Sequence, residues 1–207
     1  MSVYLVGAVD IHDAEGYERY RAGVPKAVAP YSDGVEILSA DDNPLVLEGT
    51  QPANHLFISE FPSLEVLKEF YYSKAYQQVM QYRSSSAVTK FLMVMRGRDE
   101  ILERITTPAY FVAAIEIQDF DEYGLYRDQA PKSIAAFPDL KVLSNDDHPL
   151  VLEGTQPANH LVLARSASME SAKAFYDSEA YQAAMRHRLK GSKALFYMIM
   201  RGIDRKV

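Results

Sequence analysis

One histidine in each half of the chain is the residue best suited to proton transfer. The phrase DDNPLVLEGTQPANHL covers residues 41–56 and DDHPLVLEGTQPANHL covers residues 146–161, so His55 and His160 occupy the same place in each. Imidazole titrates close to neutral pH and can accept or release a proton once a neighbouring group orients it. Both histidines are therefore candidate catalytic residues.

The groups that could orient each histidine lie in the same half of the chain. Glu48 and its counterpart Glu153 are candidate second catalytic groups, and Tyr20 is another candidate partner of His55. In the alternative interpretation, His55 is a half-buried residue bonded to backbone, and Glu48 likewise bonds the backbone. One histidine in each copy of the phrase lacks the further ligands of a zinc site, so we expect no metal.

A buried arginine is the second kind of functional candidate. The motif Y-x-x-x-M-x-x-R ends at Arg83 in the first half and at Arg188 in the second. On a helix this spacing puts the arginine on the same face as core residues, where its donors need a carboxylate or an anionic ligand. The structural alternatives are an internal salt bridge with Glu48 and a favourable charge at a helix C-terminus.

Tyrosine and asparagine side chains complete the candidate ligand-binding set. Besides the arginines, it consists of Tyr20, Tyr126, Tyr76, Tyr181, Asn54 and Asn159. Tyrosines at helical spacing are also common as plain core residues, and an asparagine of this kind can instead bond backbone.

Arginine, tyrosine and histidine together suit a small molecule that carries a carboxylate or a carbonyl group. Such a molecule could be bound in a pocket of each repeat and isomerised or cleaved by proton transfer without a cofactor. A non-catalytic ligand sensor and a structural or partner-binding protein are the alternatives. A pocket that holds Arg83 with His55 or Glu48 would favour the first two functions, whereas an Arg83 saturated by its own glutamate would favour the third.

Composition and missing motifs exclude several classes of binding partner and of chemistry. The chain has 207 residues, a formal net charge of −6 and no cysteine, which argues against nucleic acid, anionic membranes, disulfides and thiol chemistry. It contains no glycine-rich phosphate loop, no H-E-x-x-H and no G-x-S-x-G motif. The opening MSVYLVGAVD is typical of a strand rather than a signal peptide, and no apolar run is long enough to span a membrane. We therefore expect a cytoplasmic protein.

The whole chain is an internal duplication. We expect one repeat at 1–97, a linker at 98–108 and a second repeat at 109–207. The repeated phrase differs at one position, Asn43 against His148, whereas the stretches that follow it, 57–97 and 162–202, differ at most positions. Either both repeats constrain this phrase or a sequence-copying event made the two copies alike.

Each repeat contains the same series of predicted elements. In the first repeat, strands are expected at 3–11, 34–40, 44–49, 55–61 and 90–95. One helix should start after Asp13 and another after Ser63, with a restart near Ser73. Pro25, like Pro131 in the second repeat, should kink or break the first helix.

The order β-α-β-β-α-β predicts an antiparallel sheet with both helices on one face, which is a ferredoxin-like α+β fold. The strand at 3–11 is apolar on both faces, so the second face of the sheet must also be covered. We expect two four-stranded sheets packed sheet to sheet as an intramolecular pseudo-dimeric α+β barrel. A further homodimer of the whole chain is left open.

The recurring motifs resemble the family called domain of unknown function 1330. Those motifs are Tyr17/Tyr20/Arg21, Leu47-Glu48-Gly49 with Pro52, Phe61-Pro62-Ser63, Phe70-Tyr71-Ser73-Tyr76-Gln77 and Arg83. The resemblance implies the dimeric α+β barrel superfamily, whose members usually dimerise as one-domain chains, and so a fused tandem version here. The chain departs from the family in having Gln51 and Gln156 where an aromatic residue is frequent, and Ser166-Ala167-Ser168 in place of Phe-Pro-Ser. The family implies no activity.

Overall fold

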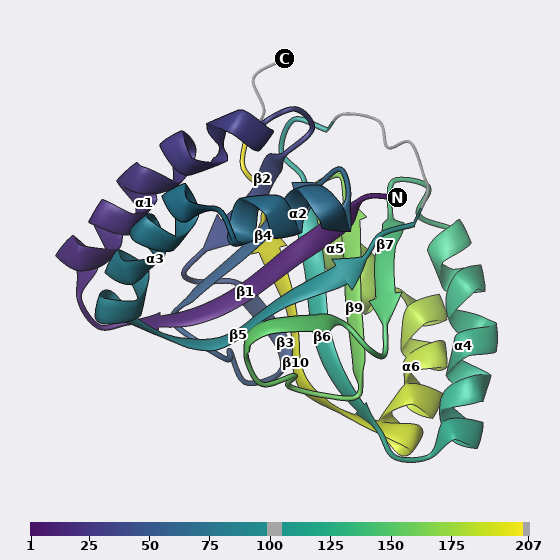
Figure 1. Cartoon of the computed structure of the whole chain (residues 1–207). Helices are drawn as coiled ribbons and strands as arrows, with labels where there is room; N and C mark the ends of the chain where they lie inside the picture. Colours follow the sequence, from purple (N-terminus) through teal and green to yellow (C-terminus); the bar gives the residue numbers. More distant parts are fainter. Residues whose placement is uncertain (99–104, 205–207) are drawn as a thin grey trace. The chain divides into compact units, whose positions relative to one another are not determined.

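The computed structural model describes residues 1–98 and 105–204 (Figure 1), so the predicted linker at 98–108 lies partly outside the described residues. Within the described residues, the chain divides into two compact units. The first unit contains residues 1–42, 52–98 and 149–156, and the second contains residues 43–51, 105–148 and 157–204. Each unit is therefore built from both halves of the sequence.

The first unit is organised around a five-stranded antiparallel sheet. Its strands, in spatial order, are β2 (Glu36–Asp41), β4 (His55–Phe61), β1 (Val3–Ile11), β5 (Ala87–Arg96) and β8 (Leu150–Gly154). The strands expected at 3–11 and 55–61 begin and end at those residues. The first four have the strand order of a ferredoxin-like repeat, and β8 is added from the second half of the chain.

Three helices belong to this sheet, and each begins where its capping residue predicts. They are α1 (Ala14–Val28), capped by Asp13, α2 (Leu64–Tyr71), capped by Ser63, and α3 (Lys74–Ser86), capped by Ser73. Each cap side chain accepts a hydrogen bond from a backbone N–H of the first turn, which would otherwise have no partner. Helices α1 and α3 lie side by side (Figure 1), and a one-turn 3₁₀ helix, η1 (Ala29–Tyr31), follows α1.

Of the two outcomes expected at the prolines, a kink or a break, the break does not occur in either helix. Helix α1 continues through Pro25 to Val28, and α4 (Phe120–Ala135) continues through Pro131. Both prolines lie in the last turn or so of their helix. Few backbone hydrogen bonds remain beyond them, and the lost donor costs little at that position.

Both faces of β1 are buried, as its composition predicts. Val3, Leu5 and Val9 belong to the core cluster that also contains residues of α1, α2 and α3. On the opposite face, Tyr4 and Val6 are each only 2% exposed. The stacking of one sheet on the other stays a prediction.

The second unit repeats the plan. Its sheet, in spatial order, contains β3 (Leu45–Gly49), β10 (Ser192–Arg201), β6 (Ala109–Ile117), β9 (His160–Ser166) and β7 (Lys141–Asp146). Its helices are α4, α5 (Met169–Asp177) and α6 (Glu179–Gly191), of which α4 and α6 lie side by side (Figure 1). No helix among the described residues is both long and apolar enough to cross a membrane.

Each sheet has five strands rather than the expected four because the short strand of the repeated phrase is exchanged. Strand β3 pairs with β10, and β8 pairs with β5. Gly49 and Gly154 end these strands with φ of 71° and 72°. A Cβ at Gly49 would lie 2.0 Å from the carbonyl oxygen of Leu195, so only glycine permits this approach. A turn expected within one repeat is thus the point where the chain leaves one unit for the other.

Candidate functional site

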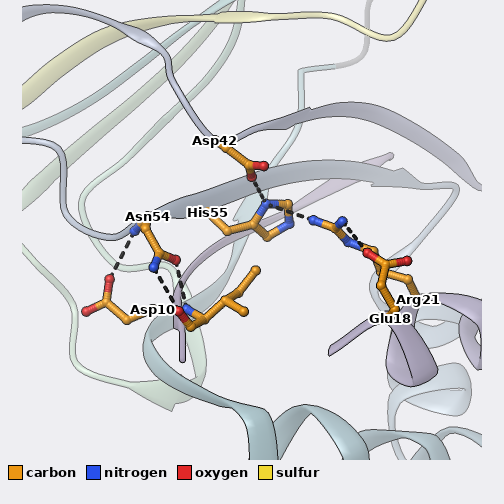
Figure 2. Close-up of polar contacts among 7 residues, drawn as sticks. Asp10, Glu18, Arg21, Asp42, Asn54 and His55 are labelled. Atoms are coloured by element: carbon orange, nitrogen blue, oxygen red, sulfur yellow. Dashed lines mark hydrogen bonds and ion pairs between the residues drawn. The ribbon is translucent and has the colours of Figure 1, made fainter. Parts of the chain in front are cut away.

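A histidine–aspartate pair stands at one edge of the first unit. His55 is the first residue of β4, and Asp42 directly follows the neighbouring strand β2. The distance from Nδ1 of His55 to Oδ1 of Asp42 is 2.5 Å (Figure 2). An ionised carboxylate only accepts, so Nδ1 carries the hydrogen and Nε2 keeps its lone pair. The partner is Asp42, not Glu48 or Tyr20 as the sequence suggested.

The imidazole of His55 is buried and favours its neutral form. The ring is part of a residue that is 4% exposed. Burial lowers the pKa of His55, and the hydrogen bond and negative charge of Asp42 only partly oppose this, so the pKa lies below its ordinary value of 6.5. His55 is therefore neutral at pH 7, with Nε2 in the state that a general base requires.

The second unit contains the same pair. Nδ1 of His160, at the start of β9, lies 2.5 Å from Oδ1 of Asp147, which follows β7. His160 is 5% exposed. Burial again lowers the pKa of the ring against the opposing effect of Asp147. In both units, the aspartate of the pair is the second residue of the near-identical phrase and the histidine is the last but one.

Tyr17 and Arg21 of α1 lie against this pair. The ring of Tyr17 packs edge to face on His55, with centroids 5.5 Å apart and an interplanar angle of 71°. The guanidinium of Arg21 lies 5.1 Å from the Tyr17 ring centroid, and its Nη2 is 3.4 Å from Nδ1 of His55. Arg21 also donates to Glu18 (Figure 2). Its positive charge further disfavours protonation of His55.

Two polar atoms at this site keep free hydrogen-bonding capacity. Among the described residues, neither Nε2 of His55 nor the hydroxyl of Tyr17 has a hydrogen-bond partner. Tyr17 is 2% exposed, and burial raises the pKa of its hydroxyl to about 12, so the phenol is protonated and can donate. Neither atom is among the fully buried side-chain atoms without a partner, so both keep some contact with solvent, and a water molecule or a ligand can reach them. Tyr17 was not among the predicted site residues, although the motif Y-x-x-Y-R contains it.

Asn54 fixes the backbone directly before His55. Its side-chain oxygen accepts from the backbone N–H of Ile11, and its Nδ2 donates to the carbonyl of Ile11 at 2.9 Å. Its own backbone N–H donates to Asp10 (Figure 2). Asn159 makes the same contacts with the backbone of Ile117. This is the structural role foreseen for the asparagines, and it positions the histidines.

The buried arginine of the first unit is neutralised within the protein. Arg83, on α3, is 1% exposed. Its Nη1 donates to Oε2 of Glu153 at 2.9 Å, and its Nη2 lies 2.5 Å from Oε1. Nη1 also donates to Thr89, and the hydroxyl of Tyr71 donates to Glu153. Burial would raise the pKa of Glu153, but the hydrogen bond and charge of Arg83 outweigh it and lower the pKa.

The second unit pairs its arginine in the same crossed way. Nη1 of Arg188 donates to Oε2 of Glu48 at 3.2 Å, and the hydroxyl of Tyr176 donates to Oε1 of Glu48 at 2.8 Å. The predicted salt bridge between Arg83 and Glu48 is therefore wrong. Glu48 and Glu153 lie on the exchanged strands, so each joins the arginine of the other half of the sequence.

The predicted tyrosines gather around these arginines. The hydroxyls of Tyr20 and Tyr76 are 3.1 Å apart, and the guanidinium of Arg83 lies 5.6 Å from the Tyr20 ring centroid. Tyr20 also contacts Tyr17, with centroids 5.3 Å apart. A continuous series of rings therefore connects His55 with Arg83. Tyr126 and Tyr181 take the same positions near Arg188.

The arrangement separates a neutral proton acceptor from an internal ion pair, in which Nε of Arg83 has no hydrogen-bond partner among the described residues. The terminal nitrogens of Arg83 hold an internal carboxylate, so an anionic ligand would have to displace Glu153. The polar atoms that could bind a ligand are instead Nε2 of His55 and the hydroxyl of Tyr17. Among residues 1–98 and 105–204, no three His, Asp or Glu side chains gather as a metal ion would require.

Solved structures of similar fold align with nearly the whole chain. A mutant chlorite dismutase from Candidatus Nitrospira defluvii has a TM-score of 0.61 and 12% identity, over 98% of this chain and 91% of that one. A candidate monooxygenase from Lactobacillus acidophilus NCFM has a TM-score of 0.56 and 9% identity, over 98% and 93%. Identities this low show the fold alone. The expected fold class, α+β with two ferredoxin-like repeats, is confirmed.

No curated protein matches the sequence. The model of one family, described as a domain of unknown function (DUF1330), matches twice, at residues 2–97 and 108–203. The two matches leave only a short connection and a short C-terminal stretch uncovered. The chain therefore belongs to this family and carries two copies of its domain in tandem.

Proposed function

We propose that each unit binds a small molecule with a carbonyl and a carboxylate group and moves a proton on it through the histidine of the His–Asp pair. The observation that carries this proposal is the state of His55: buried, held by Asp42 through Nδ1 and neutral, with Nε2 free. The same state recurs at His160.

The proposed step needs only groups of this chain. Nε2 of His55 takes a proton from the carbon next to the carbonyl, and the carbonyl oxygen becomes an enolate. The protonated hydroxyl of Tyr17 donates to that oxygen, and Arg21 supplies a positive charge for the carboxylate. Returning the proton from Nε2 to a different atom of the same molecule completes an isomerisation. No electrons are gained or lost.

The near-identity of the repeated phrase supports a shared function at both sites. The phrase contains Asp42, Asn54 and His55 of one unit and Glu48 of the other. A structural constraint on Glu48 and Asn54 explains part of the identity. The aspartate–histidine pair gives a chemical reason for the remainder.

A structural or partner-binding protein is the second candidate. The observation that favours it is the internal ion pair of each buried arginine, Arg83 with Glu153 and Arg188 with Glu48. In that case the buried charges would only determine which strands pair, and the histidines would be core residues.

Pyruvate in D₂O separates these candidates, because it carries both groups and an enolisable methyl. The wild-type protein should accelerate loss of the methyl proton signal, and pyruvate should shift the imidazole nitrogen resonances of His55 and His160. His55→Gln/His160→Gln should remove the acceleration. His12→Gln, which changes an exposed histidine outside the site, should keep it. The structural candidate gains if the wild type shows neither exchange nor a resonance shift.

A further inference from the structure

The two units differ in the sheet residues that lie near the histidine. In the first unit, the sheet register places Gly7 between Phe57 on one side and Leu92 on the other. The equivalent row of the second unit is Val162, Ala113 and Tyr197. The aromatic residue therefore stands on opposite sides of the central strand in the two units.

In the first unit the aromatic ring, that of Phe57, lies next to the histidine. Phe57 lies two residues after His55 on β4, and their ring centroids are 6.1 Å apart. The Phe57 ring also lies over the backbone of Gly7, where a Cβ would be only 2.3 Å from Cζ of Phe57. A Cβ at position 7 would therefore force the Phe57 ring to shift, and this ring lies beside the imidazole of His55.

In the second unit the aromatic residue of the row is Tyr197, which lies next to Arg188. Tyr197 lies 5.2 Å below the guanidinium of Arg188, measured to its ring centroid, and its hydroxyl accepts from Tyr181 at 3.2 Å. Beside His160, a benzyl group and a hydrogen are replaced by the isopropyl group of Val162 and the methyl group of Ala113. Val162 and Ala113 together carry fewer side-chain atoms than Phe57 and Gly7.

We infer that the two sites accept substrates of different size, with a small substituent at His55 and a bulky aryl substituent at His160, and that Phe57 and Val162 determine this difference. The inference rests on the proposed function for its substrate class. The predicted difference in substrate size rests only on the paired sheet residues of the two units. It follows that the duplication produced two complementary specificities within one chain.

Pyruvate and phenylpyruvate test the specificity, because they differ only by a phenyl group on the enolisable carbon. Pyruvate should shift the resonances of both histidines. Phenylpyruvate should shift those of His160 at a concentration about tenfold below that needed for His55, at the lower end of discrimination by an apolar pocket. Equal responses to phenylpyruvate, or a stronger response at His55, would overturn the inference.

Exchange of the paired residues supplies matched variants. Phe57→Val/Gly7→Ala should let phenylpyruvate reach His55, and Val162→Phe/Ala113→Gly should exclude it from His160. The second residue of each pair is changed because the Phe57 ring does not fit over a Cβ. Unchanged preferences in variants that remain folded would contradict the assignment of these positions.

Diethylpyrocarbonate distinguishes failure of the inference from failure of the proposed function. This reagent acylates neutral imidazole, and peptide mass spectrometry reads each histidine separately. His160 should react faster than His55, and Phe57→Val/Gly7→Ala should reduce the difference. If the rates differ as expected but neither keto acid binds, the substrate class is wrong and the size difference holds. If the rates are equal, the size difference is wrong even when pyruvate binds.

Discussion

His55 is held by a carboxylate whose own side chain is largely exposed to solvent. The side chain of Asp42 is 67% exposed, whereas that of His55 is 5% exposed. Water therefore screens the charge of Asp42, and the desolvation of the ring decides its protonation state. The pair orients the imidazole without making it strongly basic.

The pKa of the two histidines gives a prediction about stability. Because the folded-state pKa is below the ordinary value of 6.5, the unfolded chain binds more protons as the pH falls through that region. The free energy of unfolding should therefore fall as the pH is lowered from about 7 to 5. Denaturant titrations at several pH values measure this. In His55→Gln/His160→Gln, the free energy of unfolding should fall less over this pH range. An equally large fall would mean that other groups cause the pH dependence.

Asp42→Asn tests how the carboxylate orients the imidazole of His55. The negative charge of Asp42 raises the pKa of His55 against the effect of burial, so its removal should lower that pKa further. Proton exchange of pyruvate should also become slower, because the neutral amide no longer fixes the hydrogen on Nδ1. Imidazole resonances followed through pH give the pKa. His160 in the same variant serves as an internal control and should keep its value.

The exchanged strands depend on glycines that no other residue can replace. A side chain at Gly49 or Gly154 would meet the backbone of Leu195 or Lys90 and would also have an unfavourable positive φ. Gly49→Ala should therefore destabilise the protein by about 1–3 kcal/mol or more, as seen for strained backbone positions. Thermal unfolding measures it. Gly124→Ala is the matched control because nothing lies within 4 Å of the added methyl, and it should be neutral or stabilising.

The ion pair between an exchanged strand and a helix should be costly to break from one side only. Arg83→Met leaves Glu153 without its charge partner, and Glu153→Gln leaves a buried guanidinium. Each should cost about 3 kcal/mol, near the lower end for buried pairs because Glu153 is 24% exposed. Arg83→Met/Glu153→Leu should recover much of the loss. A double variant as unstable as the sum of the singles would contradict this view of the pair.

At the scale of the whole molecule, neither half of the sequence can complete its own unit. Residues 1–97 lack β8 and Glu153, and they have an unused β3 with Glu48. A fragment of these residues should therefore form a homodimer in which each copy gives its β3 to the other. Sedimentation of the fragment over a range of concentrations tests this. A stable folded monomer would contradict it.

The sequence by itself determined the local elements and their order. Capping residues placed the helix starts at Asp13, Ser63 and Ser73, and alternating apolar residues placed β1 and β4, because these signals act within a few residues of the chain. The duplication and its motifs also led to the family. The helix breaks considered at the prolines do not occur, because the effect of a proline depends on how much helix follows it.

Only the tertiary structure decided which residues meet. The sequence brought His55 together with Glu48 because both belong to one phrase, but the chain crosses to the other unit between Asp42 and Asn43 and returns at Pro52. Glu48 consequently reaches Arg188, and Asp42 takes the place beside His55. Strand exchange leaves no local signal, because the backbone of an exchanged strand is the same as that of a strand kept within its own repeat. Its partner is determined by contacts far apart in the sequence.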